Sequence, residues 1–180
     1  FSEEEFYMNY FQEPGRAEAE IEGDVRGWLV GFYYGASGDA PPGSGRFATV
    51  EPGHLLRDRF VFPEGDIPWL SATDLEHYVA EFERTGLTGG LNRYRNLDRD
   101  WADLAALRGQ PLTVPALFIG GEKDGPTIWG AGAIARFDKT VPALRGSHVL
   151  EGCGHWVQQE RPDEVNRLLV DFLAEVRPTG

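Results

Sequence analysis

The sequence predicts an α/β protein in which a helical region is followed by part of a parallel sheet. Up to about Gly109 the sequence reads as helices and loops, and in the helical stretches apolar residues recur at steps of three and four. Residues 112–119 then form a nearly continuous apolar run followed by two glycines, which is typical of a strand buried in a parallel sheet. From this run to the carboxyl end, strand and helix patterns alternate, which is the rhythm of a parallel α/β sheet.

The first part of the helical region contains one periodic and one irregular stretch. Residues 16–35 predict a single amphipathic helix with a glutamate-rich first turn, and its apolar positions are Ala17, Ile21, Val25, Trp28, Leu29 and Phe32. Residues 36–70 show little periodicity. Irregular stretches of this length usually belong to a functional cover or a mobile segment, so we expect a long loop here.

A further helix is expected from about residue 73. Thr73 suits its N-cap, Glu76 would complete a capping box, and Gly86 ends the periodic pattern. The expected buried stripe comprises Leu75, Tyr78, Val79 and Phe82. Residues 89–109 predict one or two further short helices.

The carboxyl-terminal region predicts two strands and two helices. After the strand at 112–119, we expect a helix beyond Pro126, a brief strand at 148–150 and a final helix that begins near Pro162. The final helix carries one apolar face, made of Val165, Leu168, Leu169, Phe172, Leu173 and Val176. Two parallel strands cannot pair both their edges or cover both their faces, so we expect this chain to be part of a larger protein or half of a complex.

Composition and charge narrow the class of protein. With 17 basic and 29 acidic side chains the net charge is −12, which argues against binding to nucleic acid or to anionic membranes. No apolar run approaches the roughly 18 residues of a membrane span. Cys153 is the only cysteine, so an intrachain disulfide and a cysteine-based zinc cluster are excluded. A single cysteine suits a reducing compartment, and we expect a cytoplasmic protein.

Asp124 and His155 are the candidate catalytic pair. Asp124 follows the first expected strand and His155 follows the second, so both should emerge at the same edge of a parallel sheet. A carboxylate that accepts the Nδ1 proton of an imidazole fixes its tautomer and stabilises the imidazolium, which would make His155 a general base. The other histidines lack such a setting: we expect His54 and His77 at the surface and His148 in the strand.

No convincing nucleophile for this pair occurs in the chain. The acid-then-histidine order is that of α/β-hydrolases, whose nucleophile comes earlier on a strand-to-helix turn, but no Gly-x-Ser-x-Gly motif is present. Ser37 and Ser44 have no strand before them, and Cys153 lies inside the turn of His155 itself. Asp100 precedes Trp101 as in some nucleophile turns, yet no apolar strand leads into it, so we expect a helix-surface acid beside a buried tryptophan. The partner of His155 is therefore expected outside this chain.

Four segments carry a resemblance to a known family: YFQEPGRAEAEIE, GLNRYRNLDRDW, VPALFIGGEKD and GCGHWVQQERPDEVN. Together they resemble the carboxyl-terminal half of the soluble epoxide hydrolases of the α/β-hydrolase fold. The resemblance covers most of the chain and is weakest over residues 36–70. It implies that residues 1–108 form a helical lid with an irregular loop at 36–70, and that residues 109–180 are the carboxyl-terminal part of the core. The amino-terminal half would then be missing from this chain.

The resemblance also implies a mechanism and its residues. Such enzymes open an epoxide with an aspartate, and a His–Asp pair then activates the water that hydrolyses the ester to a vicinal diol. Asp124 and His155 match this pair. Tyr7 and Tyr94 match the two lid tyrosines that hydrogen-bond the epoxide oxygen, with Tyr10 as the main competitor of Tyr7. A phenol stays protonated at neutral pH yet can donate as negative charge develops.

The resemblance further implies an apolar pocket for a small lipophilic epoxide, to which Met8, Phe11 and Trp156 would contribute as substrate-binding residues. No cofactor and no metal are expected. The expected partner is the amino-terminal half of the same protein or a partner chain, and a homodimer is left open. Two alternatives stay open: a haloalkane or haloacid dehalogenase-type hydrolase, and a non-catalytic truncated binding module that keeps the lid as a ligand cover.

Overall fold

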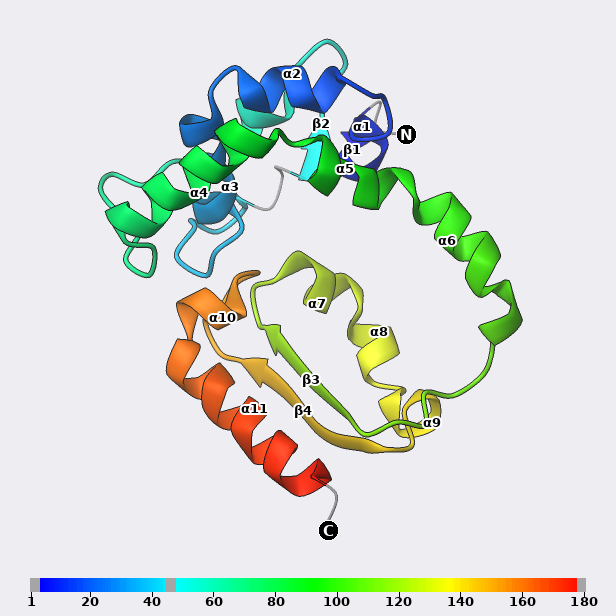
Figure 1. The fold of residues 1–180 in the computed structure, drawn as a ribbon. Coiled ribbons are helices and arrows are strands. Elements are labelled where there is room, and N and C mark those ends of the chain that lie inside the picture. Colours follow the sequence, from blue (N-terminus) through cyan, green and yellow to red (C-terminus); the bar gives the residue numbers. More distant parts are fainter. Residues whose placement is uncertain (1–3, 45–47, 178–180) are drawn as a thin grey trace. The chain divides into compact units, whose positions relative to one another are not determined.

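The computed structural model describes residues 4–44 and 48–177, and these fall into two compact units (Figure 1). The first unit comprises Phe1–Gly35 and Ala40–Arg108, and the second comprises Ala36–Asp39 and Gly109–Gly180. Each unit has a hydrophobic core of its own. The chain therefore passes from one unit to the other after Gly35, after Asp39 and after Arg108.

The first unit is built mainly from helices. Its elements in chain order are β1 (Glu5–Phe6), α1 (Tyr7–Tyr10), α2 (Arg16–Glu22), α3 (Val25–Gly35), β2 (Thr49–Val50), η2 (Leu56–Arg59), α4 (Ala72–Thr85), α5 (Thr88–Arg95), α6 (Leu97–Asp103) and η3 (Leu104–Leu107). The two very short strands, β1 and β2, pair antiparallel. Helices α3 and α4 pack together, and their apolar faces meet in the core. The prediction of one or two short helices over residues 89–109 is confirmed by α5 and α6, and the 3-10 helix η3 is an additional element.

The prediction of one helix over residues 16–35 is wrong, because the chain breaks between α2 and α3. The side chain of Asp24 accepts a hydrogen bond from the N–H of Gly27 at 2.9 Å, and its carbonyl accepts the N–H of Trp28 at 3.0 Å. Asp24 therefore caps a new helix. Both helices bury an apolar face in the same core, so the three- and four-residue spacing of apolar residues continues across the break. Periodicity therefore did not reveal the break.

The start of α4 also differs from the prediction. Ser71, not Thr73, is the N-cap, and its hydroxyl accepts the N–H of Asp74 at 3.1 Å. Glu76 lies outside the cap and pairs with Arg26 at 2.7 Å. The expected end of the helix at Gly86 is confirmed, and this residue adopts a φ of 70° that favours glycine.

The segment that follows Ala40 packs into the first unit although its sequence shows little periodicity. It contributes five buried apolar side chains to the core, namely Val50, Leu56, Phe60, Ile67 and Leu70. Phe60 lies against Gly31 of α3 so closely that a Cβ at that glycine would overlap its ring. This segment is therefore held by side-chain contacts with other elements of the unit and not by long helices or strands of its own.

Glu20 in α2 is the polar anchor of this segment. Glu20 is only 7% exposed, and its carboxylate accepts four hydrogen bonds. The donors are the Tyr10 hydroxyl at 2.5 Å, the Trp28 indole N–H at 3.1 Å, and the backbone N–H groups of Leu56 at 3.2 Å and Arg57 at 2.9 Å. A buried carboxylate is costly unless such donors surround it. Glu20 thus ties η2 to α1, α2 and α3.

The second unit contains the parallel pair of strands that the sequence predicted. Strands β3 (Ala116–Gly121) and β4 (Leu144–Leu150) pair in parallel, with Ile119 opposite His148. Their crossover contains α7 (Gly125–Trp129), α8 (Ala131–Ile134) and α9 (Phe137–Thr140), and β4 is followed by α10 (Val157–Glu160) and α11 (Pro162–Val176). Within this unit, Figure 1 shows the two strands between α11 and the crossover helices.

Both strands have bounds that differ from the predicted ones. The first begins at Ala116 and not at residue 112, because Pro115 has no N–H to pair and the N–H of Leu112 bonds the carbonyl of Thr140 at 2.8 Å. The second is longer than 148–150 and starts at Leu144. Its exposed and half-buried residues alternate, which hid its first half from a search for apolar runs.

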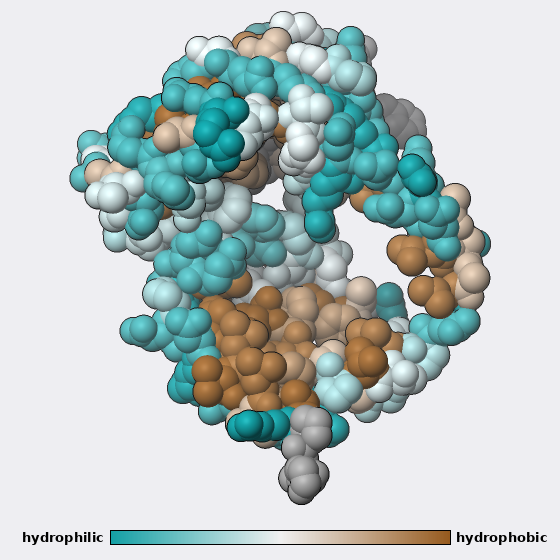
Figure 2. Space-filling model, in the orientation of Figure 1, coloured by the Kyte–Doolittle hydropathy of each residue, from teal (hydrophilic) through white to brown (hydrophobic). Residues whose placement is uncertain are grey.

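Apolar side chains remain exposed on the second unit. Val149 is 50% exposed, and Leu169, Val170 and Leu173 of α11 are 41%, 64% and 60% exposed. Figure 2 shows this apolar surface gathered in one area of the unit. In the part of the chain that the structure describes, no helix is long and apolar enough to cross a membrane.

Replacing Glu20 with glutamine tests the anchor. Each oxygen of the Glu20 carboxylate accepts two of the four hydrogen bonds, but the glutamine amide has only one acceptor oxygen. Two buried donors would therefore face its NH2 group, and we expect the free energy of unfolding to fall by about 2 kcal/mol or more. Urea unfolding monitored by circular dichroism measures this. Glu83→Gln on the exposed side of α4 is the matched control and should unfold like the wild type. Equal stability of both variants would contradict the role of Glu20.

Candidate active site

Asp124 and His155 meet at the carboxyl ends of the two parallel strands. Asp124 is the N-cap of α7, three residues beyond β3, and His155 lies in the turn after β4. The Nδ1 atom of His155 lies 2.8 Å from Oδ1 of Asp124. The Asp124 side chain is 11% exposed and the His155 side chain 44%. The two side chains that the sequence placed on neighbouring loops are therefore in contact.

The Asp124 carboxylate is held in a fixed orientation. Its second oxygen, Oδ2, accepts hydrogen bonds from the backbone N–H of Thr127 at 3.1 Å and from the Thr127 hydroxyl at 2.9 Å. Burial acts to raise the pKa of the Asp124 carboxyl, but the hydrogen bonds from His155 and Thr127 outweigh it and hold that pKa below its ordinary value. An ionised Asp124 accepts a hydrogen bond from the Nδ1–H of His155, which leaves Nε2 of His155 as the basic nitrogen.

The loops that carry the pair are packed backbone to backbone. The N–H of Lys123 bonds the carbonyl of Cys153 at 2.9 Å, and the N–H of Gly152 bonds the Glu122 carboxylate at 2.9 Å. A Cβ at Gly121 would overlap the carbonyl oxygen of Gly154. Only glycine fits at this position, so the two loops lie as close as their backbones allow.

The alternative nucleophiles have settings that do not suit them. Cys153 is fully buried, and burial together with the nearby charge of Glu160 raises the pKa of its thiol to about 11, which keeps it protonated near neutral pH. Ser44 donates its hydroxyl proton to the carbonyl of Pro41 at 2.6 Å. Asp100 lies on the exposed surface of α6, as expected, but the prediction of a buried tryptophan beside it is wrong, because Trp101 is 69% exposed. The Arg108 guanidinium covers the Trp101 ring at 4.8 Å from its centre.

The other histidines lie where the sequence placed them. His54 and His77 are exposed, and His54 pairs with Asp58 at 3.3 Å. His148 lies within β4.

Tyr7 and Tyr94 come together in the first unit. Their rings, from α1 and α5, meet edge to face with centroids 5.8 Å apart, and the Phe11 ring contacts both, at 5.6 Å from Tyr7 and 5.0 Å from Tyr94. Phe11 is 4% exposed and belongs to the core, whereas Met8 is half-buried. Residues 87 positions apart in the sequence thus form one aromatic cluster.

Tyr10 is committed to a structural contact. It is 1% exposed, and its hydroxyl donates to the Glu20 carboxylate. Burial and the contact with Glu20 raise the pKa of the Tyr10 phenol well above its ordinary value. A hydroxyl in this position is not available to a ligand, which leaves Tyr7 as the tyrosine of this segment that lies beside Tyr94.

Two polar residues that the sequence analysis did not single out hold the tyrosine segments together. The side-chain amide of Gln12 donates to the carbonyls of Met8 at 2.9 Å and Tyr94 at 3.0 Å. Arg95 donates to the Phe11 carbonyl at 2.9 Å, and its two terminal nitrogens bind the Glu18 carboxylate at 2.7 and 2.8 Å. Hydrogen bonds from Arg95 lower the pKa of Glu18 to about 2. Gln12 and Arg95 lie within the motifs that carried the resemblance, and this position was the signal by which the sequence could have pointed to them.

Trp156 lies next to the pair in the second unit. Its half-buried ring meets the His155 ring edge to face, with centroids 4.8 Å apart. It therefore contacts the histidine directly, as a wall residue of the site would.

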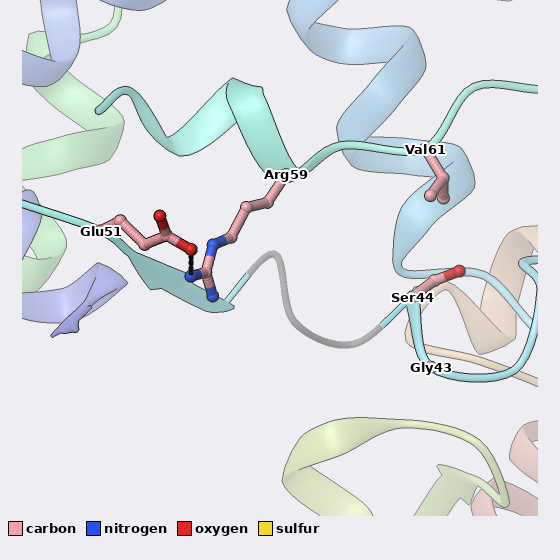
Figure 3. Close-up of a pocket in the computed structure, with 5 residues that line it drawn as sticks. All are labelled: Gly43, Ser44, Glu51, Arg59 and Val61. Carbon is pink, nitrogen blue, oxygen red and sulfur yellow. Dashed lines mark hydrogen bonds and ion pairs between the residues drawn. The ribbon is translucent and has the colours of Figure 1, made fainter. Parts of the chain in front are cut away.

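A separate pocket of about 310 Å³ lies in the first unit (Figure 3). It is lined by Gly43, Ser44, Glu51, Arg59 and Val61. Arg59 is engaged by Glu51 at 2.6 Å and by Glu4 at 2.7 Å. None of the predicted site residues lines this pocket.

Comparison with known proteins identifies the family. The sequence profile described as "Alpha/beta hydrolase family" matches residues 14–168. The chain belongs to the alpha/beta hydrolase family. An epoxide hydrolase from an endophytic Streptomyces has a solved structure that superposes with a TM-score of 0.93 at 59% sequence identity, covering 98% of this chain and 54% of that one. The predicted α/β-hydrolase fold is thereby confirmed.

Two curated relatives of this chain are named as epoxide hydrolases. The chain is 43% identical to epoxide hydrolase B of Mycobacterium tuberculosis, over 96% of this chain and 54% of the relative. Epoxide hydrolase A of the same organism is 42% identical over 96% of this chain and 53% of the relative. The resemblance found in the sequence is confirmed, and the chain spans about half the length of the curated relatives it matches.

The Glu18–Arg95 pair generates a stability prediction. The folded pKa of Glu18 lies below its ordinary value of 4.5, so the pair stabilises the folded chain fully above pH 4.5, and this contribution is lost as the pH falls towards 2. We expect Arg95→Ala to lower the free energy of unfolding by about 3 kcal/mol at pH 7. The deficit relative to the wild type should shrink between pH 4.5 and 2, as measured by urea unfolding. A deficit that does not change with pH would show that packing, and not charge, is responsible.

Proposed function

We propose that this chain supplies the water-activating pair and the phenolic hydrogen-bond donors of an epoxide hydrolase. The observation that carries the proposal is the 2.8 Å contact between Nδ1 of His155 and Oδ1 of Asp124 at the carboxyl ends of adjacent parallel strands. The pairing of Tyr7 with Tyr94 and the similarity to epoxide hydrolases support it. The attacking carboxylate would come from residues outside these 180, from the remainder of the protein or a partner chain.

The first step of the proposed reaction opens the epoxide. The carboxylate attacks an epoxide carbon, the carbon–oxygen bond of the ring breaks, and a hydroxyalkyl ester of the enzyme forms. The released oxygen carries negative charge, and the hydroxyls of Tyr7 and Tyr94 would donate hydrogen bonds and a proton to it. Donors directed at developing charge are each worth roughly 10²–10³ in rate.

The second step hydrolyses the ester. Nε2 of His155 takes a proton from water, the hydroxide attacks the ester carbonyl, and the ester bond breaks. The diol leaves with a proton from the imidazolium. The carboxylic acid left on the enzyme then returns a proton to the tyrosinate formed in the first step, which regenerates both the carboxylate and the phenol. Asp124 stabilises the imidazolium during this step, which is why its lowered pKa suits the role. The sum of both steps adds one water to one epoxide.

The exposed apolar area of the second unit supports the view that more of the fold is needed. Val149 on β4 and Val170 and Leu173 on α11 are each at least half exposed. Large side chains of this kind are normally covered in a hydrolase core. We infer that the remainder of the hydrolase fold covers them.

Two alternative functions make different predictions. A dehalogenase would need halide-binding side chains, such as tryptophan or asparagine, where this chain has Tyr7 and Tyr94. A non-catalytic binding module would bind an epoxide without converting it. The matched positions of both tyrosines and of the His–Asp pair favour the epoxide hydrolase.

A chimera tests the proposed function. In it, this chain replaces the matched segment of the Streptomyces epoxide hydrolase, whose other part supplies the rest of the fold. We expect hydrolysis of a lipophilic epoxide such as styrene oxide. His155→Gln should lower the turnover by roughly 10²–10⁴ because water activation is lost. Intact-mass spectrometry should then detect an adduct equal to the mass of the epoxide. Unchanged turnover in a folded His155→Gln chimera would sink the mechanism.

The tyrosines should affect the other step. Tyr94→Phe and Tyr7→Phe remove donors to the opening ring, so each should slow turnover by roughly 10-fold or more without accumulation of the adduct. Tyr78→Phe, whose ring packs against Tyr33 at 5.8 Å, is the matched control and should retain turnover. Adduct accumulation in Tyr94→Phe would place its role in ester hydrolysis and contradict the proposal.

A further inference from the structure

We propose that Glu160 is a positioning residue that sets the backbone of the turn carrying His155. The proposal rests on the proposed function, in which His155 activates water. Glu160 ends α10 and is only 9% exposed. It touches neither the His155 ring nor Asp124 in any described contact, so its action on the site would pass through the backbone.

The Glu160 carboxylate binds the backbone on both sides of His155. Its Oε2 accepts the N–H of Gly154 at 2.9 Å, and its Oε1 accepts the N–H of Trp156 at 3.0 Å. Hydrogen bonds from N–H groups to a carboxylate are about twice as strong as those between neutral groups. The peptide groups that flank the histidine therefore have one common acceptor.

A second contact passes through residues Ala36–Asp39, which we call the strap. Oε2 of Glu160 also accepts the N–H of Gly38 at 2.8 Å, while Lys123 donates its ammonium to the carbonyl of Gly38 at 2.6 Å. The N–H of His155 in turn donates to the carbonyl of Ala36 at 2.8 Å. Three successive backbone N–H groups are thus bound: Glu160 accepts those of Gly154 and Trp156, and the strap accepts that of His155 between them.

The strap and the histidine turn are too close to tolerate side chains between them. A Cβ at Gly38 would overlap the carbonyl oxygen of Gly152, and a Cβ at Gly154 would overlap the backbone of Ser37 and Gly38. Backbones in such contact move together, because no flexible side chain lies between them to absorb a shift. A displacement of the Glu160 carboxylate would therefore move the His155 backbone.

The position of that backbone matters for the proposed chemistry. The Nδ1–Oδ1 distance of 2.8 Å depends on where the two loops end, and Asp124 is itself fixed by Thr127. Because Thr127 holds the Asp124 carboxylate, a shift of the His155 backbone that the carboxylate does not match would stretch this hydrogen bond and turn Nε2 away from its water. A misplacement of about 1 Å can cost roughly 10²-fold in rate.

The chimera with Glu160→Gln tests the positioning role. The amide keeps one acceptor oxygen for three N–H donors, so we expect kcat to fall by roughly 10-fold or more with KM little changed. Ester hydrolysis should be the slowed step, so the epoxide adduct should accumulate as in His155→Gln. Glu160→Asp keeps the charge on a shorter side chain and should fall between the wild type and Glu160→Gln. Glu164→Gln, on the exposed start of α11, is the matched control.

Nuclear magnetic resonance of the 180-residue chain gives a readout independent of turnover. In Glu160→Gln the N–H groups of Gly38, Gly154 and Trp156 should exchange faster with solvent, and the deshielded Nδ1 proton of His155 should broaden or shift. If Glu160→Gln does not fold, the same N–H exchange rates and the same Nδ1 proton signal are measured in Glu160→Asp, where we expect smaller changes in the same direction. Wild-type kcat and an unchanged Nδ1 signal in a folded variant would overturn the positioning role. If the His155→Gln chimera still lost turnover in that case, the proposed function would be supported and only the positioning role of Glu160 would be rejected.

Discussion

Buried carboxylates that accept several hydrogen bonds hold the irregular parts of both units. Glu20 accepts four donors and fixes the start of η2 in the first unit, and Glu160 accepts three backbone N–H groups in the second. The backbone around Leu56 and Gly38 lacks the regular ladder of a helix or sheet, so its N–H groups need another acceptor. A carboxylate with two oxygens can serve several such groups at once, and each donor lowers the cost of burying its charge.

The contact between Asp124 and His155 depends on this arrangement. Parallel pairing of β3 and β4 brings their carboxyl ends to one edge, but it fixes the backbone only as far as Gly121 and Leu150. Between Leu150 and His155, the position of the chain is set by glycine contacts and by acceptors in other loops. A 2.8 Å hydrogen bond therefore rests on groups that do not themselves take part in the proposed chemistry.

The sequence predicted the parts of this molecule that regular patterns encode. The parallel strands, the final helix from Pro162 and the contact of Asp124 with His155 followed from periodicity and from the order of the elements. The break at Asp24 and the packed segment after Ala40 did not, because tertiary contacts create them without changing the local spacing of apolar residues. The roles of Glu20 and Glu160 were hidden for a related reason. The chain has 29 acidic residues, and composition cannot tell a buried acceptor from a solvated charge.

The choice between Tyr7 and Tyr10 illustrates how burial decides between identical side chains. Both lie in α1, three residues apart, and sequence alone left them in competition. The Tyr10 phenol is buried against the Glu20 carboxylate, which raises its pKa and uses its proton in a structural hydrogen bond. Giving that proton to an opening epoxide would place a phenolate beside a carboxylate, and two like charges in a buried site repel strongly. The same carboxylate that anchors the first unit thus removes Tyr10 from the proposed chemistry, and the ring beside Tyr94 is that of Tyr7.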